Sequence, residues 1–489
     1  MKIKDQFSSR WGIIFAGLGM AIGTGNIWRF PRVVSQNGGG AFMIAWLFFL
    51  FFWSIPLLII EMSIGKKTRL GVIGSFGTIM GKKFTWMGTF VAFVPTAITF
   101  YYTVVTGWCL KYFIATSFQG LIKRDSLQFW RGFTSSWEPV VFHFAAITTG
   151  CFIIYSGVVK GIERSNKFFI PSLFILLIIG CLRVLTLPGA FKGMNFLFSP
   201  NFPMLLDYKI WLSALSQSAW STGAGWGLML TYSIYSHKNE NPIITSSTIG
   251  FGNCTASLLA SIMVIPTVFS FFYSQNFSHE KIMEVMKANN QGLTFIWIPN
   301  LFSKVPAGSL FLALFFLALC FAAFSSLISQ LELITRILID AGLSRKRAVG
   351  VVGVCCFIMG LPSALSIAFF SNQDWVWGLG LIVSGSFFTI AVIKTGPKRF
   401  REEIIAATNS EIHLGKAFDI LIKFFLPLQA LAMLVWWFWT SYSSNPASWL
   451  NIFSQTSVGT VLFQWSVAIV VFIFLNKVIN KKIFSLNYS

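Results

Sequence analysis

The chain has 489 residues, of which 55% are hydrophobic, 17% aromatic and only 11% charged, and its mean hydropathy is +0.71. This composition excludes a soluble globular protein and indicates one that crosses a membrane several times. A net charge of +21 would suit a nucleic-acid-binding protein, but the basic residues lie in short clusters between apolar segments, so we expect no nucleic-acid partner.

Windows of about 20 apolar residues mark the stretches that could cross a lipid bilayer as helices. The sequence contains about twelve of them, which predicts an all-α polytopic membrane protein. They lie near residues 11–33, 41–65, 86–118, 141–159, 167–186, 208–236, 243–272, 308–340, 347–370, 374–394, 416–441 and 458–477. Clusters of Lys and Arg follow every second span. Because basic loops stay in the cytoplasm, we expect a multi-pass protein of the cell membrane with both termini in the cytoplasm.

The first predicted span contains the segment GLGMAIGTGNIWRFP at residues 17–31. Its closely spaced glycines weaken the helix, which is therefore expected to open here. In hydrocarbon an open turn is tolerated only where its backbone groups find partners. Close packing of two helices through small residues is the alternative explanation. Asn26 and Arg29, just beyond the glycines, favour a binding site at the break.

The sixth predicted span repeats this glycine crowding in the segment STGAGWG at residues 221–227. The two interruptions are five helices apart. Interruptions at corresponding positions of two halves are typical of secondary transporters built from inverted repeats, with the substrate site near the middle of the membrane. The amino ends of the half-helices would face an anionic group, and the unwound carbonyl groups would coordinate a cation.

Catalytic and metal-binding patterns are missing from the sequence. The seven cysteines have no metal-ligand spacing, and the four histidines are scattered near span ends or in loops without a nucleophile or acid–base cluster around them. We therefore expect neither an enzyme nor a zinc protein. A channel would need a continuous polar pore, whereas the sequence offers a single site near the middle of the membrane.

Several motifs occur in one order along spans one to ten: GTGNIWRFP at 23–31, NGGGAF at 37–42, KGIER at 160–164, LTFIWIP at 293–299 and LSRKRAV at 343–349. With these motifs the chain resembles the neurotransmitter:sodium symporter family, of which LeuT is a bacterial member. The resemblance implies a LeuT-like 5+5 inverted repeat with discontinuous helices 1 and 6. It implies a cytoplasmic segment at 1–10, a first repeat at 11–186, an extracellular loop at 187–207, a second repeat at 208–397, and helices 11 and 12 with a cytoplasmic C-terminus at 398–489.

The function implied by the resemblance is sodium-coupled symport of a neutral amino acid by alternating access. Gly23 stands where the amine transporters of the family carry an aspartate, and this glycine indicates a substrate with its own carboxylate. Gly223 enlarges the floor of the implied side-chain pocket and Trp220 and Trp226 occupy part of that volume, and on balance we expect a bulky hydrophobic or aromatic side chain. The alternative is a sodium-dependent amino acid binding sensor on a transporter scaffold, without appreciable flux. The sequence leaves a monomer and a weak dimer both open.

The resemblance also implies binding residues, which gather around the two breaks. The substrate would be bound by Ala21, Thr24, Gly25, Ile98, Tyr102, Trp220, Ser221, Gly223, Trp226, Ser326 and Gln330. Gln330 could hydrogen-bond a polar or indole side chain, or turn away toward a neighbouring helix. One sodium ion would be held by Ala21, Asn26, Ser221, Asn253 and the substrate carboxylate. A second would be held by Gly19, Ile22, Ala322, Ser325 and Ser326.

An anion site and two gates complete the implied functional residues. Chloride would be bound by Gln217, Ser221, Asn253 and Ser257, although Trp46 replaces the tyrosine that the animal transporters have there. Arg29 with Asp374 would close the extracellular side, and Lys4 with Asp340 the cytoplasmic side, with Tyr235 next to them. Charged residues at span ends can also be simple interfacial anchors.

Overall fold

The computed structural model describes residues 6–274, 292–303, 307–405 and 414–485, and within these ranges it contains helices and no strand. The sixth predicted span, near 208–236, is divided into two shorter helices, Tyr208–Ser221 and Leu228–Ser233. Ten described helices are long and apolar enough to cross a membrane, and a bent pair, Arg10–Ala21 with Thr24–Gln36, forms one more span. The expectation of an all-α polytopic protein is confirmed.

The first half of the chain forms five spans joined by short helices. Their bounds are α1 (Arg10–Ala21), α2 (Thr24–Ile27), α3 (Arg29–Gln36), α4 (Gly40–Phe49), α5 (Ile55–Thr68), α6 (Val72–Met80), α7 (Thr85–Phe118), α8 (Ser126–Thr134), α9 (Glu138–Tyr155), α10 (Arg164–Leu185) and α11 (Ala190–Phe198). Wider π-helical turns join α4 to α5, at Leu50–Ser54, and lead into α10, at Val158–Glu163.

The second half begins with the other interrupted span. Its helices are α12 (Tyr208–Ser221), α13 (Leu228–Ser233), α14 (Pro242–Ser274), α16 (Ile298–Phe302), α17 (Gly308–Asp340), α18 (Arg345–Leu365), α19 (Ile367–Thr395), α20 (Pro397–Arg399), α21 (Lys416–Ile420), α22 (Leu426–Ser444) and α23 (Val458–Ser485). The boundary between α18 and α19 lies earlier than the hydropathy predicts. The side chain of Ser366 accepts a hydrogen bond from the Phe369 backbone N–H at 3.2 Å and so caps the start of α19.

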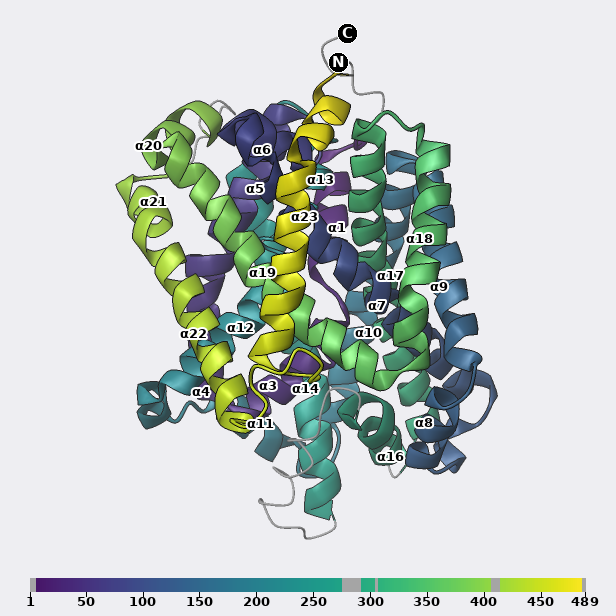
Figure 1. Ribbon diagram of the computed structural model, residues 1–489. Coiled ribbons are helices and arrows are strands. Elements are labelled where there is room, and N and C mark those ends of the chain that lie inside the picture. The colour runs from purple at the N-terminus through teal and green to yellow at the C-terminus, as the bar shows by residue number, and fades with distance from the viewer. Residues whose placement is uncertain (1–5, 275–291, 304–306, 406–413, 486–489) are drawn as a thin grey trace.

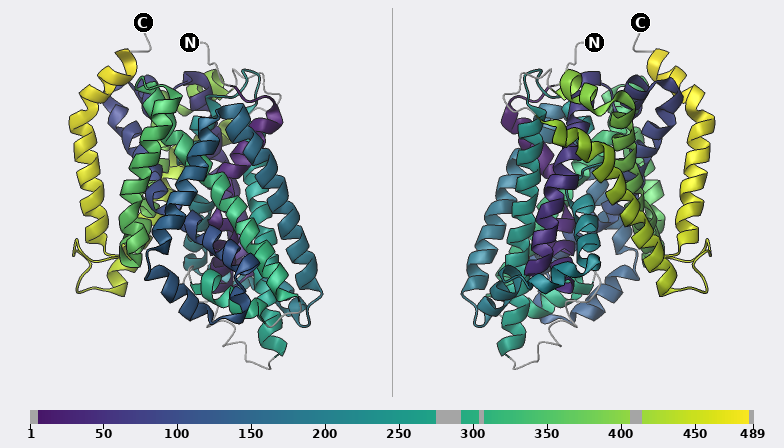
Figure 2. Two further views of the ribbon diagram at one scale, coloured as in Figure 1. Left: turned by 90° about the vertical axis from the view of Figure 1, so that its right-hand side faces the viewer. Right: turned by 90° about the vertical axis from the view of Figure 1, so that its left-hand side faces the viewer.

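The helices are arranged around two central spans. Helix α7 packs against α17, α9 and α19, and α1 packs against α17, α10 and α14. In Figure 1, α22 lies at the left of the bundle and α23 in front of it, and both views of Figure 2 place α23 at the outer edge. The start of α1 and the end of α23 lie at the same end of the bundle (Figure 1), which we call the terminal face. The other end is the opposite face.

The two breaks have different physical causes. In the second, Gly223, Gly225 and Gly227 have φ angles of +68°, +85° and +76°, a conformation that side chains rarely adopt. In the first, Gly23 has an ordinary extended backbone with φ −112°. A Cβ atom there would lie 2.8 Å from Ser326 Oγ. The second break therefore needs glycine for its backbone shape, and the first needs it for space.

Candidate functional site

A cavity of about 240 Å³ lies between the two breaks and reaches toward the opposite face. Every residue that the sequence assigned to the substrate lines it. These residues are Ala21, Thr24, Gly25, Ile98, Tyr102, Trp220, Ser221, Gly223, Trp226, Ser326 and Gln330. The structure thus brings together residues from α1, α2, α7, α12, α17 and the second break.

The polar end of the cavity is built by the first break and α7. Tyr102 Oη accepts hydrogen bonds from the Thr24 backbone N–H at 3.3 Å and from Thr24 Oγ1 at 3.5 Å. No atom lies within 4 Å of the position that a Cβ on Gly25 would take. Open space therefore adjoins Gly25 at the start of α2, next to the Tyr102 hydroxyl group, and a carboxylate would have room at this helix amino end.

The other end of the cavity is largely apolar. Ile98 is buried, and the rings of Trp220 and Trp226 meet edge to face with their centroids 6.2 Å apart. Gln330 lines the cavity and also contacts a neighbouring helix, because its Oε1 accepts a hydrogen bond from Thr99 Oγ1 at 3.2 Å. Gln330 thus contacts a neighbouring helix, as one of the two alternatives expects, while it still lines the cavity.

Glu61 fixes the shape of the second break. It is fully buried in α5, and its carboxylate accepts hydrogen bonds from the Gly225 N–H at 2.6 Å and the Leu230 N–H at 3.2 Å. On the far side of the loop, Ser384 Oγ donates to the Gly225 carbonyl at 2.5 Å. The unwound segment is thus tied to both α5 and α19 and forms a defined wall of the cavity.

A first cluster of oxygen atoms joins the first break to α14. Asn26 Nδ2 donates to Asn253 Oδ1 at 2.7 Å, and Asn26 Oδ1 accepts from the Gly23 N–H at 3.0 Å. The same end of the Asn253 amide lies 3.1 Å from the Ala21 carbonyl oxygen and 2.9 Å from that of Ser221. Three oxygen atoms facing one another repel unless a cation lies among them or the amide turns its nitrogen toward the carbonyls.

A second cluster of oxygen atoms joins the first break to α17. Ser326 Oγ lies 3.2 Å from the Gly19 carbonyl oxygen and 3.3 Å from that of Ile22. Ser325 Oγ lies 3.4 Å from the Ile22 carbonyl oxygen and 3.0 Å from that of Ala322. All five residues predicted for the second sodium ion therefore meet. Carbonyl and hydroxyl oxygens are the ligands that a hard cation prefers.

The residues predicted for chloride lie next to the first cluster. Ser257 Oγ accepts from Asn26 Nδ2 at 2.7 Å, and Asn253 Nδ2 donates to Ser221 Oγ at 3.4 Å. Gln217 is fully buried, and neither its amide nitrogen nor its amide oxygen has a partner within the described residues. Since buried amides are normally hydrogen-bonded, this side chain has capacity for a ligand.

Arg29 and Asp374, the residues predicted for the extracellular gate, lie at the end of the cavity toward the opposite face. Arg29 lies over the Trp220 ring, with its Cζ atom 4.9 Å from the ring centroid. Among the described residues no ion pair joins Arg29 to Asp374, although both line the cavity. The cavity continues past them to Trp375 and Trp437.

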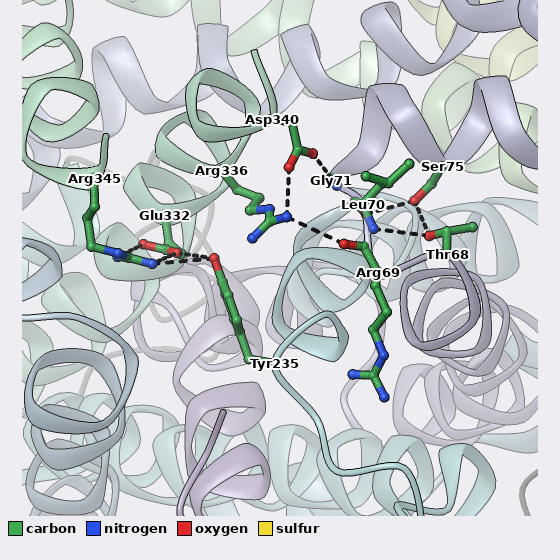
Figure 3. Close-up of polar contacts among 10 residues, drawn as sticks. All are labelled: Thr68, Arg69, Leu70, Gly71, Ser75, Tyr235, Glu332, Arg336, Asp340 and Arg345. Atoms are coloured by element: carbon green, nitrogen blue, oxygen red, sulfur yellow. Dashed lines mark hydrogen bonds and ion pairs between the residues drawn. The ribbon is translucent and has the colours of Figure 1, made fainter. Parts of the chain in front are cut away.

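Two ion-pair groups lie near the terminal face (Figure 3). In the first, Arg345 binds both carboxylate oxygens of Glu332, at 2.9 and 2.8 Å, and Tyr235 Oη donates to the same carboxylate at 2.6 Å. We call these three residues the terminal latch. In the second, Arg336 pairs with Asp340 at 2.7 Å, and Asp340 also accepts from the Gly71 N–H at 2.5 Å.

The predicted partner of Asp340, Lys4, lies outside the described residues. Within those residues Asp340 pairs with Arg336, which is one turn earlier on the same helix. Tyr235 contacts Glu332 and lies under the Arg336 guanidinium, whose Cζ atom is 5.8 Å from the ring centroid. The N-terminal segment still docks here, because the Phe7 N–H donates to the Tyr235 carbonyl at 3.1 Å.

Comparisons with known proteins agree with this geometry. The sequence matches the sodium:neurotransmitter symporter family over residues 4–138 and 123–484. The chain belongs to this family. It is 30% identical over 447 residues to the uncharacterized sodium-dependent transporter YhdH of Bacillus subtilis, covering 86% of this chain and 95% of that protein. It is 35% identical over 358 residues to an uncharacterized sodium-dependent transporter of Methanocaldococcus jannaschii, covering 71% and 72%.

A solved structure with the same fold supports the architecture of this symporter. The crystal structure of MhsT in complex with L-phenylalanine matches it with a TM-score of 0.77 and 28% sequence identity, covering 88% of this chain and 99% of that one. The protein is therefore a LeuT-like, sodium-coupled membrane transporter of the sodium:neurotransmitter symporter family. Its relatives are transporters and not enzymes.

The sequence reasoning missed three functional candidates in this symporter: Glu332, Arg336 and Arg345. Arg345 belongs to the LSRKRAV motif, and Glu332 is an acidic residue within a 33-residue apolar helix. A charge inside a membrane span usually has a partner and a function. That rule would have singled out Glu332 and Arg336, but only the fold shows which partner each has.

Removing the negative charge of Glu332 from the terminal latch should open the terminal face. In Glu332→Gln the partly exposed guanidinium of Arg345 loses its ion pair with the fully buried Glu332 carboxylate, and breaking a buried pair costs about 3 kcal/mol. We expect uptake to fall about tenfold, because a shift of this size moves a two-state equilibrium substantially. Backbone amides of residues 228–236 should exchange hydrogen faster. Glu403→Gln, which removes an exposed pair with Arg399, is the control. Unchanged exchange in Glu332→Gln would show that the latch does not hold this face closed.

Proposed function

We propose that this transporter imports a neutral amino acid with a bulky hydrophobic or aromatic side chain, together with sodium, by alternating access. The observation that carries the proposal is one cavity with two chemically different ends. Backbone N–H groups at Thr24 and Gly25 and the Tyr102 hydroxyl suit a carboxylate, while Ile98 and Trp226 suit an apolar side chain. The L-phenylalanine in the crystal structure of MhsT is an amino acid of this kind.

The proposed ligands of the amine are carbonyl groups of Ala21 and Trp220, with Ser221 and Ser326 at the edge of the site. Gly23 supports an amino acid over an amine, because the position that its Cβ would take lies 2.8 Å from Ser326 Oγ and 3.1 Å from Tyr102 Oη. An aspartate side chain there would displace the side chain of Ser326 or Tyr102. The carboxylate must then come from the substrate.

Two sodium ions are proposed, one at each oxygen cluster. At the first, Ala21, Asn26, Ser221 and Asn253 would share the ion with the substrate carboxylate. Sodium and substrate would each lack one ligand when the other is absent. Because the coupling is reciprocal, bound sodium would raise the affinity for substrate by the same factor by which bound substrate raises the affinity for sodium. At the second, Gly19, Ile22, Ala322, Ser325 and Ser326 would hold an ion whose loss frees α1 from α17. This step would favour opening of the terminal face.

The proposed topology places the terminal face in the cytoplasm, because the basic clusters lie at that side. It follows that the cavity faces outward, with Arg29 and Asp374 as the gate that closes over substrate. Residues 11–186 and 208–397 are proposed as the two inverted repeats, each with one interrupted helix. Oligomeric state is open between a monomer and a weak dimer.

Chloride is proposed as a further ion, bound by Gln217, Ser221, Asn253 and Ser257. The support is the buried Gln217 amide, whose N–H groups have no acceptor within the described residues. An anion here would offset part of the sodium charge in a region of low dielectric constant. Replacing chloride by gluconate is expected to lower sodium-driven uptake about fivefold, in keeping with a coupling free energy of about 1 kcal/mol. Equal uptake in both salts would exclude a chloride requirement.

The substrate is best identified by thermal stability of the detergent-purified protein with each of the twenty amino acids, first in sodium chloride and then in potassium chloride. A ligand that binds only the folded protein raises the midpoint of unfolding. We expect stabilisation by a few bulky neutral amino acids in sodium alone. The same stabilisation in potassium would contradict the shared sodium site. Binding without uptake into proteoliposomes would favour a sensor over a transporter.

A further inference from the structure

A buried asparagine of α10 lies against the second oxygen cluster. Asn166 is fully buried, and its Nδ2 donates to the Ile162 carbonyl one turn earlier at 2.9 Å. Its Oδ1 has no hydrogen-bond partner within the described residues. A buried amide oxygen without a donor costs free energy, which a cation could recover.

The unpartnered oxygen points at the residue that joins α1 to the cluster. A Cβ on Gly19 would lie 1.9 Å from Asn166 Oδ1 and 3.2 Å from Ser325 Cβ. The Gly19 carbonyl oxygen is the one that lies 3.2 Å from Ser326 Oγ. Asn166 Oδ1 therefore occupies the space that a side chain at Gly19 would need, directly beside the cluster.

The same contact between α1 and α10 presents a second oxygen group nearer the terminal face. A Cβ on Gly12 would lie between 2.5 and 2.8 Å from the carboxylate atoms of Glu163. That carboxylate accepts from the Ser8 N–H at 2.7 Å and from Lys167 Nζ at 2.6 Å. An amide oxygen and then a carboxylate thus follow one another from the cluster toward the terminal face.

We propose that Asn166 Oδ1 is a further oxygen ligand of the second sodium ion, supplied by a third helix on the side toward the terminal face. The inference rests on the proposed second sodium site and adds α10 to the helices that hold it. A neutral amide oxygen attracts sodium but binds it less strongly than a carboxylate, so the ion can still leave. A weak contact between Asn166 Oδ1 and the Gly19 Cα–H would be the purely structural alternative.

A series at position 166 separates these two roles. The thermal stability of the full-length, detergent-purified protein is measured against sodium concentration, with potassium chloride keeping the ionic strength constant. For Asn166→Ala we expect the half-saturating sodium concentration to rise about fivefold. This is a smaller loss of affinity than the one that usually follows removal of an outer ligand of a tightly bound metal. For Asn166→Asp we expect it to fall about fivefold, because the oxygen gains negative charge. Sodium release from proteoliposomes loaded with radioactive sodium should be slower in Asn166→Asp.

A packing role would give a different pattern. Both variants would then lower the unfolding midpoint without sodium and leave the half-saturating concentration unchanged, which would overturn the proposal. Gln429→Ala is the matched control, because Gln429 Oε1 on α22 is another buried amide oxygen without a partner in the described residues. An equal shift of the sodium dependence in Gln429→Ala would also overturn it.

Ser325→Ala distinguishes this inference from the function on which it rests. If Ser325→Ala leaves the sodium dependence unchanged, the second sodium site itself is wrong, and the role of Asn166 is wrong with it. If Ser325→Ala weakens sodium binding and the Asn166 variants do not, the site stands and Asn166 is not its ligand. With both effects present, Asn166→Asp should partly restore sodium binding to Ser325→Ala.

Discussion

Asn253→Ala is expected to abolish sodium-dependent stabilisation and uptake. The Asn253 amide contacts Asn26 at 2.7 Å and lies within 3.1 Å of the Ala21 carbonyl oxygen and 2.9 Å of that of Ser221. It thus joins α14 to both breaks at the point where the first sodium ion is proposed. Loss of a direct ligand should weaken binding about 100-fold or more, since even outer ligands of metals contribute about 10-fold to 100-fold.

Substrate binding should fall with sodium binding in Asn253→Ala. If the substrate carboxylate is itself a ligand of the first sodium ion, the coupling between the two must be lost, so residual amino acid binding should no longer depend on sodium. Thermal stability with and without sodium, at saturating amino acid, measures both effects. Asn201→Ala, at an exposed position before the short helix at Phe202–Leu206, is the control. Sodium-dependent stabilisation that survives in Asn253→Ala would place the ion elsewhere.

The parts of the fold that depend on local chemistry were predictable from the sequence. Long apolar stretches predict membrane-spanning helices because the backbone N–H and C=O groups in a bilayer must be hydrogen-bonded within the chain. The glycines at 223, 225 and 227 predict the second break because the backbone there adopts left-handed conformations. The start of α19 was missed because LPSALSIAFF contains no charged residue, and its two serines interrupt the apolar run too little to mark a boundary. A hydropathy profile contains no information on helix capping by the Ser366 hydroxyl group.

The partners of the candidate site were less predictable, because they depend on how helices face one another. The resemblance supplied the two oxygen clusters, and the structure brings those residues together. Asn166 looks like an ordinary polar residue in its span, and only the fold shows that its oxygen lies against Gly19, whose carbonyl group belongs to the second cluster. Asp340 likewise needs the fold to reveal that Arg336 and the Gly71 N–H contact it.

Glu61→Gln should have the largest effect on the stability of the unwound sixth span. The carboxylate accepts two backbone N–H groups, from Gly225 and Leu230, and is fully buried. Hydrogen bonds to a charged acceptor are about twice as strong as neutral ones. The glutamine side chain has nearly the same shape, but one of its two ends is an NH₂ group that would face an N–H group. We expect the free energy of unfolding to fall by about 3 kcal/mol.

The same substitution should affect binding beyond its effect on stability. The loop that Glu61 holds includes Gly223, which lines the cavity, and Gly225, which is also bound by Ser384 from the other side. With one of its two supports removed, the loop should sample other conformations, so amino acid affinity in saturating sodium should drop even in the folded fraction. Chemical denaturation and ligand titration measure the two effects separately, with Glu402→Gln at an exposed position as the control. Wild-type stability and affinity in Glu61→Gln would mean that α19 and the three glycines hold the break by themselves.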